Sequence, residues 1–241
     1  GLNIANCYNV TAYGLAVITS FMKPHKELSK LSLNLSGFRP VLKRGLEGLF
    51  QTLKQFSKLS YLYLNLCNSV SLSRRSLEIF SESLCNFKLL SWLTLVISLS
   101  SEIEENALNL LLENLRHNKN MRNLSLDFRK CSGLDYPGLN NLASSIQEMK
   151  FLSNLALDVS RCTAVNDESL KSLAESLKHR KLLSEVNLNV SHCISVTTQG
   201  LARFMKLTKF RSSLTCNNCP FVDIKKLNKW IETKRVVYEN R

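Results

Sequence analysis

The residues best suited to metal or redox chemistry form one short motif, Cys216-Asn-Asn-Cys219. Two cysteines at this spacing can supply half of a zinc site or a redox-active pair. The sequence contains no second motif of this kind, and its four histidines are scattered along the chain. Both cysteines also coincide with core positions of the repeat described below, so we interpret them as small buried hydrophobic residues. The sequence therefore predicts no metal site and no cofactor.

Familiar catalytic patterns are also missing from the sequence. It contains no glycine-rich phosphate loop, no G-x-S-x-G and no H-E-x-x-H, which are patterns that place nucleophiles, phosphate-binding amides or zinc ligands. The acidic pair Glu104-Glu105 falls where a helix is expected to start, and the helix dipole favours negative charge there. We predict a non-enzymatic protein that has no small-molecule substrate.

Exposed aromatic residues are the main candidates for partner binding. Tyr61, Tyr63 and Trp92 should cluster on adjacent strands of one solvent-facing surface, and aromatics of this type often anchor a protein partner. The alternative is cross-strand packing that only stabilises the sheet. Asp127, Asp158 and Glu185 should make the other end of this surface mildly acidic. The residues predicted to bind a partner are Tyr61, Tyr63, Trp92, Asn65, Asp127 and Asp158.

Basic residues suggest a second surface. The chain has 32 Lys and Arg against 19 Asp and Glu, a net charge of +13, which favours acidic partners. Lysines recur where helices should turn back into strands, at Lys26, Lys88, Lys119, Lys150 and Lys181. They predict a basic edge that could contact RNA or acidic tails. The alternatives are solubility and the preference for cations near helix C-termini. Without interleaved aromatics for base stacking, nucleic-acid binding there would be non-specific.

All these residues take their places from a repeat. Six segments read L-x-x-L-x-L-x-L, with Met, Ile, Val or Phe as substitutes, and start at residues 28, 59, 90, 121, 152 and 183, a constant spacing of 31. Between them, apolar residues spaced three and then four apart predict amphipathic helices. Residues suited to cap the helix N-termini precede these stripes at Thr11, Ser73, Asp135, Asn166 and Thr197. Each unit should contain a short strand, a loop, a helix of about three turns and a return loop.

The repeat predicts an elongated fold. A strand–helix unit cannot bury both of its apolar faces alone, so neighbouring units must stack. Parallel strands lie about 4.8 Å apart, whereas helices need about 10 Å, so the array should curve with its strands on the inner side. We predict an α/β solenoid with parallel strands on the concave face and helices on the convex face.

Leu152 to Cys162 reads L-x-x-L-x-L-x-L-x-x-C, and Leu183 to Cys193 repeats it with Val186 in place of one leucine. This pattern resembles a leucine-rich repeat, and a long unit with a true helix resembles the ribonuclease-inhibitor-like class. The resemblance implies a curved horseshoe. The unit is slightly longer than usual in that class, and Phe38 and Ser69 occupy a position that is usually Asn or Cys. Such even, Asn-, Ser- and Lys-rich repeats are also similar to those of protist, especially ciliate, proteins. Some members of the class activate GTPases, but this sequence lacks a distinctive N-terminal Arg for that activity.

The organisation and location of the chain follow from the same pattern. We predict one solenoid over residues 1–241, with six full repeats, partial terminal units and a capping helix within 220–241. The chain starts inside a unit, so we expect it to be part of a longer one. No run of eighteen apolar residues predicts a membrane span, and no signal peptide is recognisable. The eight cysteines follow the repeat, which favours a reducing compartment. We predict an intracellular, cytoplasmic protein, with ciliary or nuclear locations as alternatives.

The functional prediction is a scaffold that holds a protein partner on the concave face, within a multi-subunit complex. The alternative is a basic structural subunit of a large nucleoprotein or of a cytoskeletal or ciliary assembly. That subunit would contact RNA or acidic tails through the lysine edge.

Overall fold

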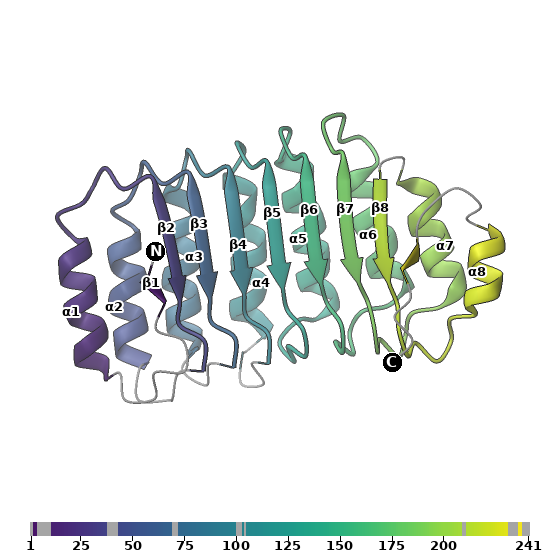
Figure 1. Ribbon diagram of the computed structural model, residues 1–241, viewed down its shortest axis with the longest axis horizontal. Helices are drawn as coiled ribbons and strands as arrows, with labels where there is room; N and C mark the ends of the chain where they lie inside the picture. Colours follow the sequence, from purple (N-terminus) through teal and green to yellow (C-terminus); the bar gives the residue numbers. More distant parts are fainter. Residues whose placement is uncertain are drawn as a thin grey trace.

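The computed structural model describes residues 2–3, 11–37, 43–68, 72–99, 103, 105–208, 211–230 and 236–237. Strands and helices alternate along the chain (Figure 1). The strands are β1 (Leu2–Asn3), β2 (Lys30–Asn34), β3 (Tyr61–Asn65), β4 (Trp92–Val96), β5 (Asn123–Asp127), β6 (Asn154–Asp158), β7 (Glu185–Asn189), β8 (Arg211–Thr215) and β9 (Val236–Val237). The helices are α1 (Ala12–Met22), α2 (Lys43–Leu53), α3 (Arg74–Asn86), α4 (Glu105–Asn114), α5 (Tyr136–Glu148), α6 (Asp167–Leu177), α7 (Thr198–Leu207) and α8 (Ile224–Trp230), and a 3₁₀ turn, η2 (Leu115–His117), follows α4.

The described strands form one parallel sheet in chain order, from β1 to β9. Residues that pair on neighbouring strands are separated by the repeat spacing of 31 residues, since Leu33 pairs with Leu64 and Leu64 pairs with Leu95. Between β7 and β8 the offset in sequence is shorter, because Leu188 pairs with Leu214, which is 26 residues further along the chain. Strand β8 begins at Arg211, and it has Ser212 where its neighbour β7 has the buried Val186.

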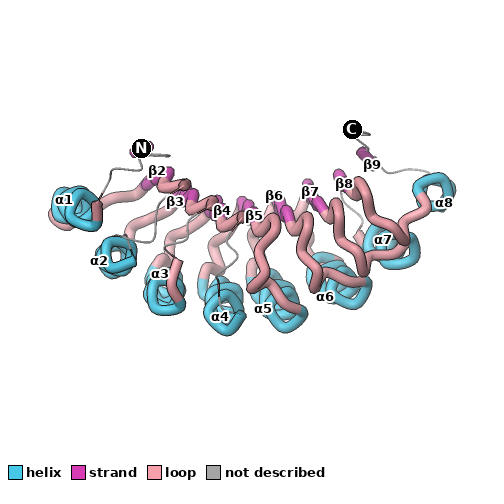
Figure 2. The backbone as a smooth tube through the Cα atoms, turned by 90° about the horizontal axis from the view of Figure 1, so that it is seen from below, coloured by secondary structure: helices cyan, strands magenta, loops and turns pink. Residues whose placement is uncertain are grey.

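The sheet forms one layer and the helices the other (Figure 1). Figure 2 shows the described strands along the inner side of a shallow open arc, with the helices along its outer side. Helices need more room than strands, so the helical layer takes the longer path. The predicted solenoid of alternating parallel strands and helices is confirmed at this level. We call the side of the sheet that faces away from the helices the inner face.

The core lies between the two layers. Along each long strand, alternate side chains point toward the helices, so that Leu62 and Leu64 are fully buried whereas Tyr61 and Tyr63 are not. The apolar stripes of the helices also face this core. Phe50 of α2 packs against Phe80 of α3, with ring centroids 5.0 Å apart. This continuous packing sets each strand and its inner-face residues at a fixed position.

The helix starts agree with the predicted caps. The side chains of Thr11, Ser73, Asp135, Asn166 and Thr197 each accept a hydrogen bond from a backbone N–H of the first turn. Asn166 also forms a capping box with Ser169. The corresponding position of the second unit, residue 42, lies outside the described residues. Each cap satisfies N–H groups that a helix start leaves unpaired, which fixes where the strand-to-helix loop ends.

A short helix, α8, is present in the segment predicted to cap the array. It packs against α7, and its Leu227 is fully buried. The next residue after α8, Ile231, lies outside the described residues. Among the described helices, none is long and apolar enough to cross a membrane.

Candidate functional site

Two of the predicted aromatic anchors lie side by side on the inner face. Tyr61 of β3 pairs in register with Trp92 of β4, and their ring centroids are 5.8 Å apart at an angle of 41°. Trp92 keeps 44% of its surface exposed, and its indole N–H donates to Thr94 Oγ1 at 3.3 Å. Cross-strand packing therefore exists, and it leaves much of the indole open. Packing orients the rings, and exposure leaves them available to a partner.

Tyr63 lies two residues further along β3, on the same face and half-buried. Its phenol oxygen is 3.5 Å from Asn65 Nδ2. We call Tyr61, Tyr63 and Trp92 together the aromatic cluster. It combines large apolar rings with polar tips, the composition that concentrates binding energy in protein interfaces.

The predicted binding residues Asn65, Asp127 and Asp158 have a structural role that sequence reasoning missed. Each side chain ends a strand and accepts the backbone N–H two residues on, at 2.9 Å from Cys67, 3.1 Å from Arg129 and 3.0 Å from Ser160. Asn34 and Asn189 repeat this contact. Asn and Asp favour such turns because their short side chains reach the backbone. The recurrence of Asn or Asp at one repeat position was the available signal.

Arg129 changes the electrostatics of the acidic end. Its Nη2 lies 2.7 Å from Asp127 Oδ2, and its Nε lies 3.6 Å from Asp158 Oδ2. The hydrogen bond to Asp127 raises the pKa of the Arg129 guanidinium. Asp158 also accepts from Asn189 Nδ2 at 2.9 Å. One guanidinium thus partly offsets the charge of the two carboxylates, and the expected mildly acidic character is reduced.

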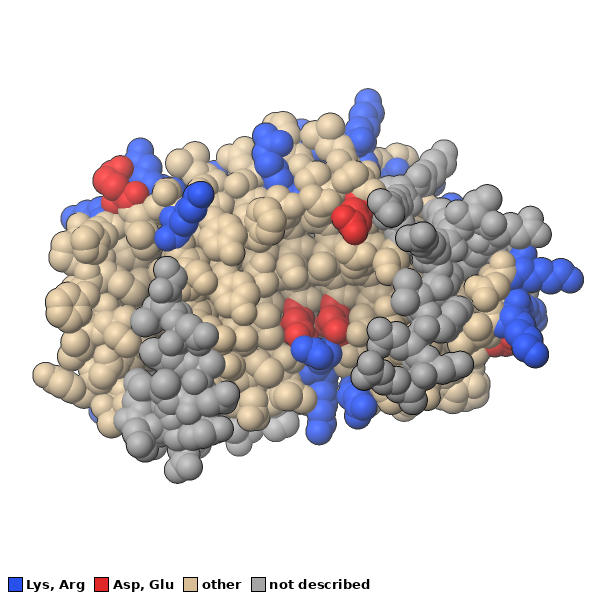
Figure 3. Space-filling view, in the orientation of Figure 1, with Lys and Arg blue, Asp and Glu red and all other residues tan. Residues whose placement is uncertain are grey.

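A polar depression adjoins this pair of carboxylates. Small side chains at Ser125, Ala156 and Ser213 leave a hollow of about 300 Å³ over β5 to β8, with Asp127 and Asp158 on its floor. Figure 3 shows the inner face, with acidic side chains at its centre. The inner face therefore combines an aromatic cluster on β3 and β4 with a hollow that a partner side chain can enter.

The lysine edge forms in the predicted place. Lys26, Lys88, Lys119, Lys150 and Lys181 lie in turns that join a helix to the next strand, and all are exposed. Lys119 Nζ is 3.9 Å from Glu148 Oε2, and none of the other four forms an ion pair with a described residue. Figure 3 shows Lys and Arg side chains along this edge, which is the upper one in that view. Neighbouring Lys54 pairs with Glu82, which moderates the charge.

The cysteines behave as core residues. Cys216 and Cys219 are both buried, and the seven described cysteines are free thiols. Cys162, Cys193 and Cys219 each donate from Sγ to a backbone carbonyl of the preceding unit, at 3.1 to 3.3 Å. Burial raises the pKa of Cys162 and of Cys193 to about 12. These thiols stay protonated near neutral pH, so they are poor nucleophiles and metal ligands.

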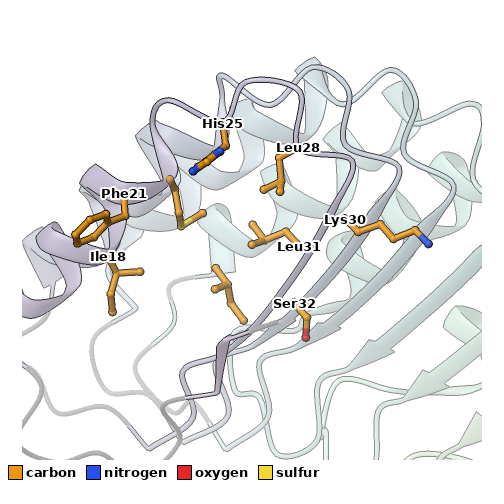
Figure 4. Close-up of a pocket in the computed structure, with 9 residues that line it drawn as sticks. Ile18, Phe21, His25, Leu28, Lys30, Leu31 and Ser32 are labelled. Atoms are coloured by element: carbon orange, nitrogen blue, oxygen red, sulfur yellow. The ribbon is translucent and has the colours of Figure 1, made fainter.

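An apolar pocket of about 380 Å³ lies at the first unit (Figure 4). It is lined by Ile18, Met22 and Leu28, with His25 at its upper rim. The corresponding residues of the next unit, at positions 49, 53 and 59, are fully buried against the unit before them. The pocket is therefore part of the stacking surface that every unit presents to its neighbour.

The described residues contain no group of three or more His, Cys, Asp or Glu that could hold a metal ion. The prominent features of the described surface are the aromatic cluster, the polar hollow and the lysine edge. No known protein-family model matches this sequence, and none of the curated proteins compared with it matches either.

Proposed function

We propose that this protein is a non-enzymatic scaffold that holds a protein partner on its inner face. We further propose that it is a leucine-rich-repeat solenoid of the ribonuclease-inhibitor-like class, with the corresponding horseshoe curvature. The repeated L-x-x-L-x-L-x-L segments and the parallel register of the sheet support this assignment. Such a protein would act within a multi-subunit complex. Its free cysteines support an intracellular, cytoplasmic location.

One observation carries the binding proposal, namely the position of Trp92. This side chain packs on Tyr61 and still exposes 44% of its surface on an open sheet. Covering an exposed indole removes apolar surface from water, at roughly 25 cal/mol per Å². The rings are already oriented by their mutual contact, so little side-chain entropy is lost on binding. The adjacent hollow and its hydrogen-bonding groups provide a polar rim.

The test is affinity capture from native lysate that is divided into a nuclease-treated and an untreated half. The double variant Tyr61→Ala and Trp92→Ala should lose a specific protein, because truncating a central aromatic anchor costs about 2 kcal/mol or more in binding. The matched control is Tyr136→Ala with Phe151→Ala, two aromatics of similar exposure (41% and 44%) outside the strands of the inner face. Circular dichroism should show that both variants remain folded.

Equal capture by the two double variants would exclude the aromatic cluster as the binding surface. Capture that disappears after nuclease treatment would instead point to a nucleic acid as the bridging partner. The captured protein should also bind the purified chain directly, with the same loss for the Tyr61 and Trp92 variant.

A second candidate function uses the lysine edge. Lys26, Lys88, Lys150 and Lys181 are exposed and form no ion pair with a described residue, so their charge is available to an acidic partner. In this alternative the protein is a basic subunit of a nucleoprotein, cytoskeletal or ciliary assembly. The contact would be electrostatic and insensitive to nucleic-acid sequence.

A further inference from the structure

A cleft of about 490 Å³ lies beside the turns that follow the strands, at the edge opposite to the lysine edge. We call it the turn cleft. It is lined by Asn68, Leu99, Lys130, Cys131, Ser132, Arg161 and Thr163. Figure 1 shows that the strand arrows point to this edge, and Figure 3 shows Lys and Arg side chains on it below the central acidic pair. None of the surfaces proposed above includes this cleft.

Two cations face the turn cleft from consecutive units. Lys130 and Arg161 occupy the same repeat position, both are exposed, and neither forms an ion pair with a described residue. The acids that end their strands, Asp127 and Asp158, are already engaged by Arg129. Arg161 Nη2 lies 3.4 Å from His192 Nε2, which positions the guanidinium without neutralising it. Among the described residues, the cleft therefore carries positive charge without a paired counter-ion.

The fold itself does not favour cations at this place. The chain enters each helix at this edge (Figure 1), so the positive ends of the helix dipoles lie here and disfavour basic residues. The backbone disfavours them as well, since Lys130 and Arg161 have φ of 53° and 62°. Other units place Gly37, Asn68, Leu99 and His192 at the same repeat position, and of these Gly and Asn accept a positive φ most readily.

We propose that the turn cleft binds a phosphoryl group carried by a side chain of a protein partner. A guanidinium and an ammonium on adjacent turns are a common means of holding a phosphate dianion. Leu99, 47% exposed at the cleft wall, offers an apolar contact to the flanking residues of a peptide. RNA is disfavoured because the described residues that line the cleft include two cations and no aromatic side chain for stacking. The site is separate from the aromatic cluster, so either proposal can fail alone.

The test measures binding by fluorescence anisotropy, with labelled short peptides that have a central phosphothreonine and random flanks. The double variant Lys130→Asn and Arg161→Asn removes both charges and keeps residues that accept a positive φ, so it should fold at least as stably as the parent. The control, Lys88→Asn with Lys150→Asn, removes the same charge from the opposite edge. We expect the first variant to weaken binding about ten-fold or more and the control to bind nearly as the parent does.

Competition identifies the source of the phosphoryl group. Excess of the same peptides without phosphate should not displace the probe, and inorganic phosphate should displace it only weakly. The proposal is overturned if both double variants weaken binding equally, since the effect is then one of net charge. It is also overturned if inorganic phosphate or an oligo-uridine RNA displaces the probe as well as the phosphopeptides do.

Discussion

At the scale of single residues, repetition gives each side chain the same neighbours in every unit. Cys162 and Cys193 illustrate this, because each thiol donates to the carbonyl of the residue that follows the preceding strand, Phe128 or Val159. A small, weakly polar side chain satisfies an otherwise buried carbonyl there. The cysteines thus contribute to unit stacking, which explains why they follow the repeat without forming a metal site.

The buried thiols make stability depend on pH in the alkaline range. A cysteine in the unfolded chain has a pKa of about 8.5, whereas burial raises the pKa of Cys193 to about 12. Above about pH 8.5 the unfolded chain therefore loses protons that the folded chain retains, and the free energy of unfolding falls as pH rises. Each such thiol contributes a slope of up to about 1.4 kcal/mol per pH unit.

Urea denaturation of the parent and of Cys193→Ala between pH 8.5 and about 10.5 measures this effect. The variant should be less stable at every pH because it leaves a cavity, but its stability should fall less steeply. Parallel pH profiles for the two proteins would show that Cys193 ionises equally in the folded and unfolded states.

At the scale of elements, the helices are linked through their N-termini as well as through their apolar stripes. Asp167, in the first turn of α6, accepts from the backbone N–H of Thr197 at 2.9 Å and from its hydroxyl at 2.6 Å. Thr197 in turn caps α7. The close approach is possible because Gly200 has no side chain, and a Cβ there would overlap the Asp167 carboxylate.

Two glycine substitutions in helices should therefore have opposite effects. Gly200→Ala should destabilise the protein by about 1–3 kcal/mol, because it disturbs a charge-assisted hydrogen bond between units. Gly48→Ala, in α2, meets no atom within 4 Å and should stabilise the protein by up to about 1 kcal/mol through helix propensity. Chemical denaturation of both variants provides the comparison. Stabilisation by Gly200→Ala would mean that α6 and α7 have room to separate without loss.

At the scale of the whole molecule, charge is divided between two edges of one sheet. The lysine edge lies where helices end, so dipoles favour its cations. The turn cleft lies where helices begin, so dipoles oppose them. The inner face between the edges holds the aromatic cluster and the polar hollow, where Arg129 pairs with Asp127. A partner on the inner face and an acidic partner on either edge would therefore occupy different surfaces.

The dependence of binding affinity on salt concentration distinguishes these modes of binding. If the lysine edge binds RNA, the logarithm of the association constant should fall linearly with the logarithm of salt concentration. Replacing Lys88, Lys119 and Lys150 with Gln should reduce that slope by about 2 to 3. A titration at several salt concentrations measures it, with the Lys130→Asn and Arg161→Asn variant as a control at the opposite edge. A flat salt response of the parent would exclude this electrostatic mode.

The sequence by itself determined the repeat, the parallel register, the helix caps and the identity of the inner-face columns. These properties are local or periodic: alternation selects the buried face of a strand, and an Asn, Asp, Ser or Thr side chain caps the helix that follows it. It also placed Tyr61 beside Trp92, since residues one repeat apart pair in parallel strands.

Only the tertiary structure decided how these residues share their interactions. Arg129 reaches across strands to Asp158, a contact that depends on side-chain direction and not on the repeat. Strand-ending residues such as Asp127 face the solvent and their own turns at once, so periodicity alone could not separate a binding role from a structural one. The turn cleft was not predicted, because its residues come together only when successive strand-to-helix turns stack.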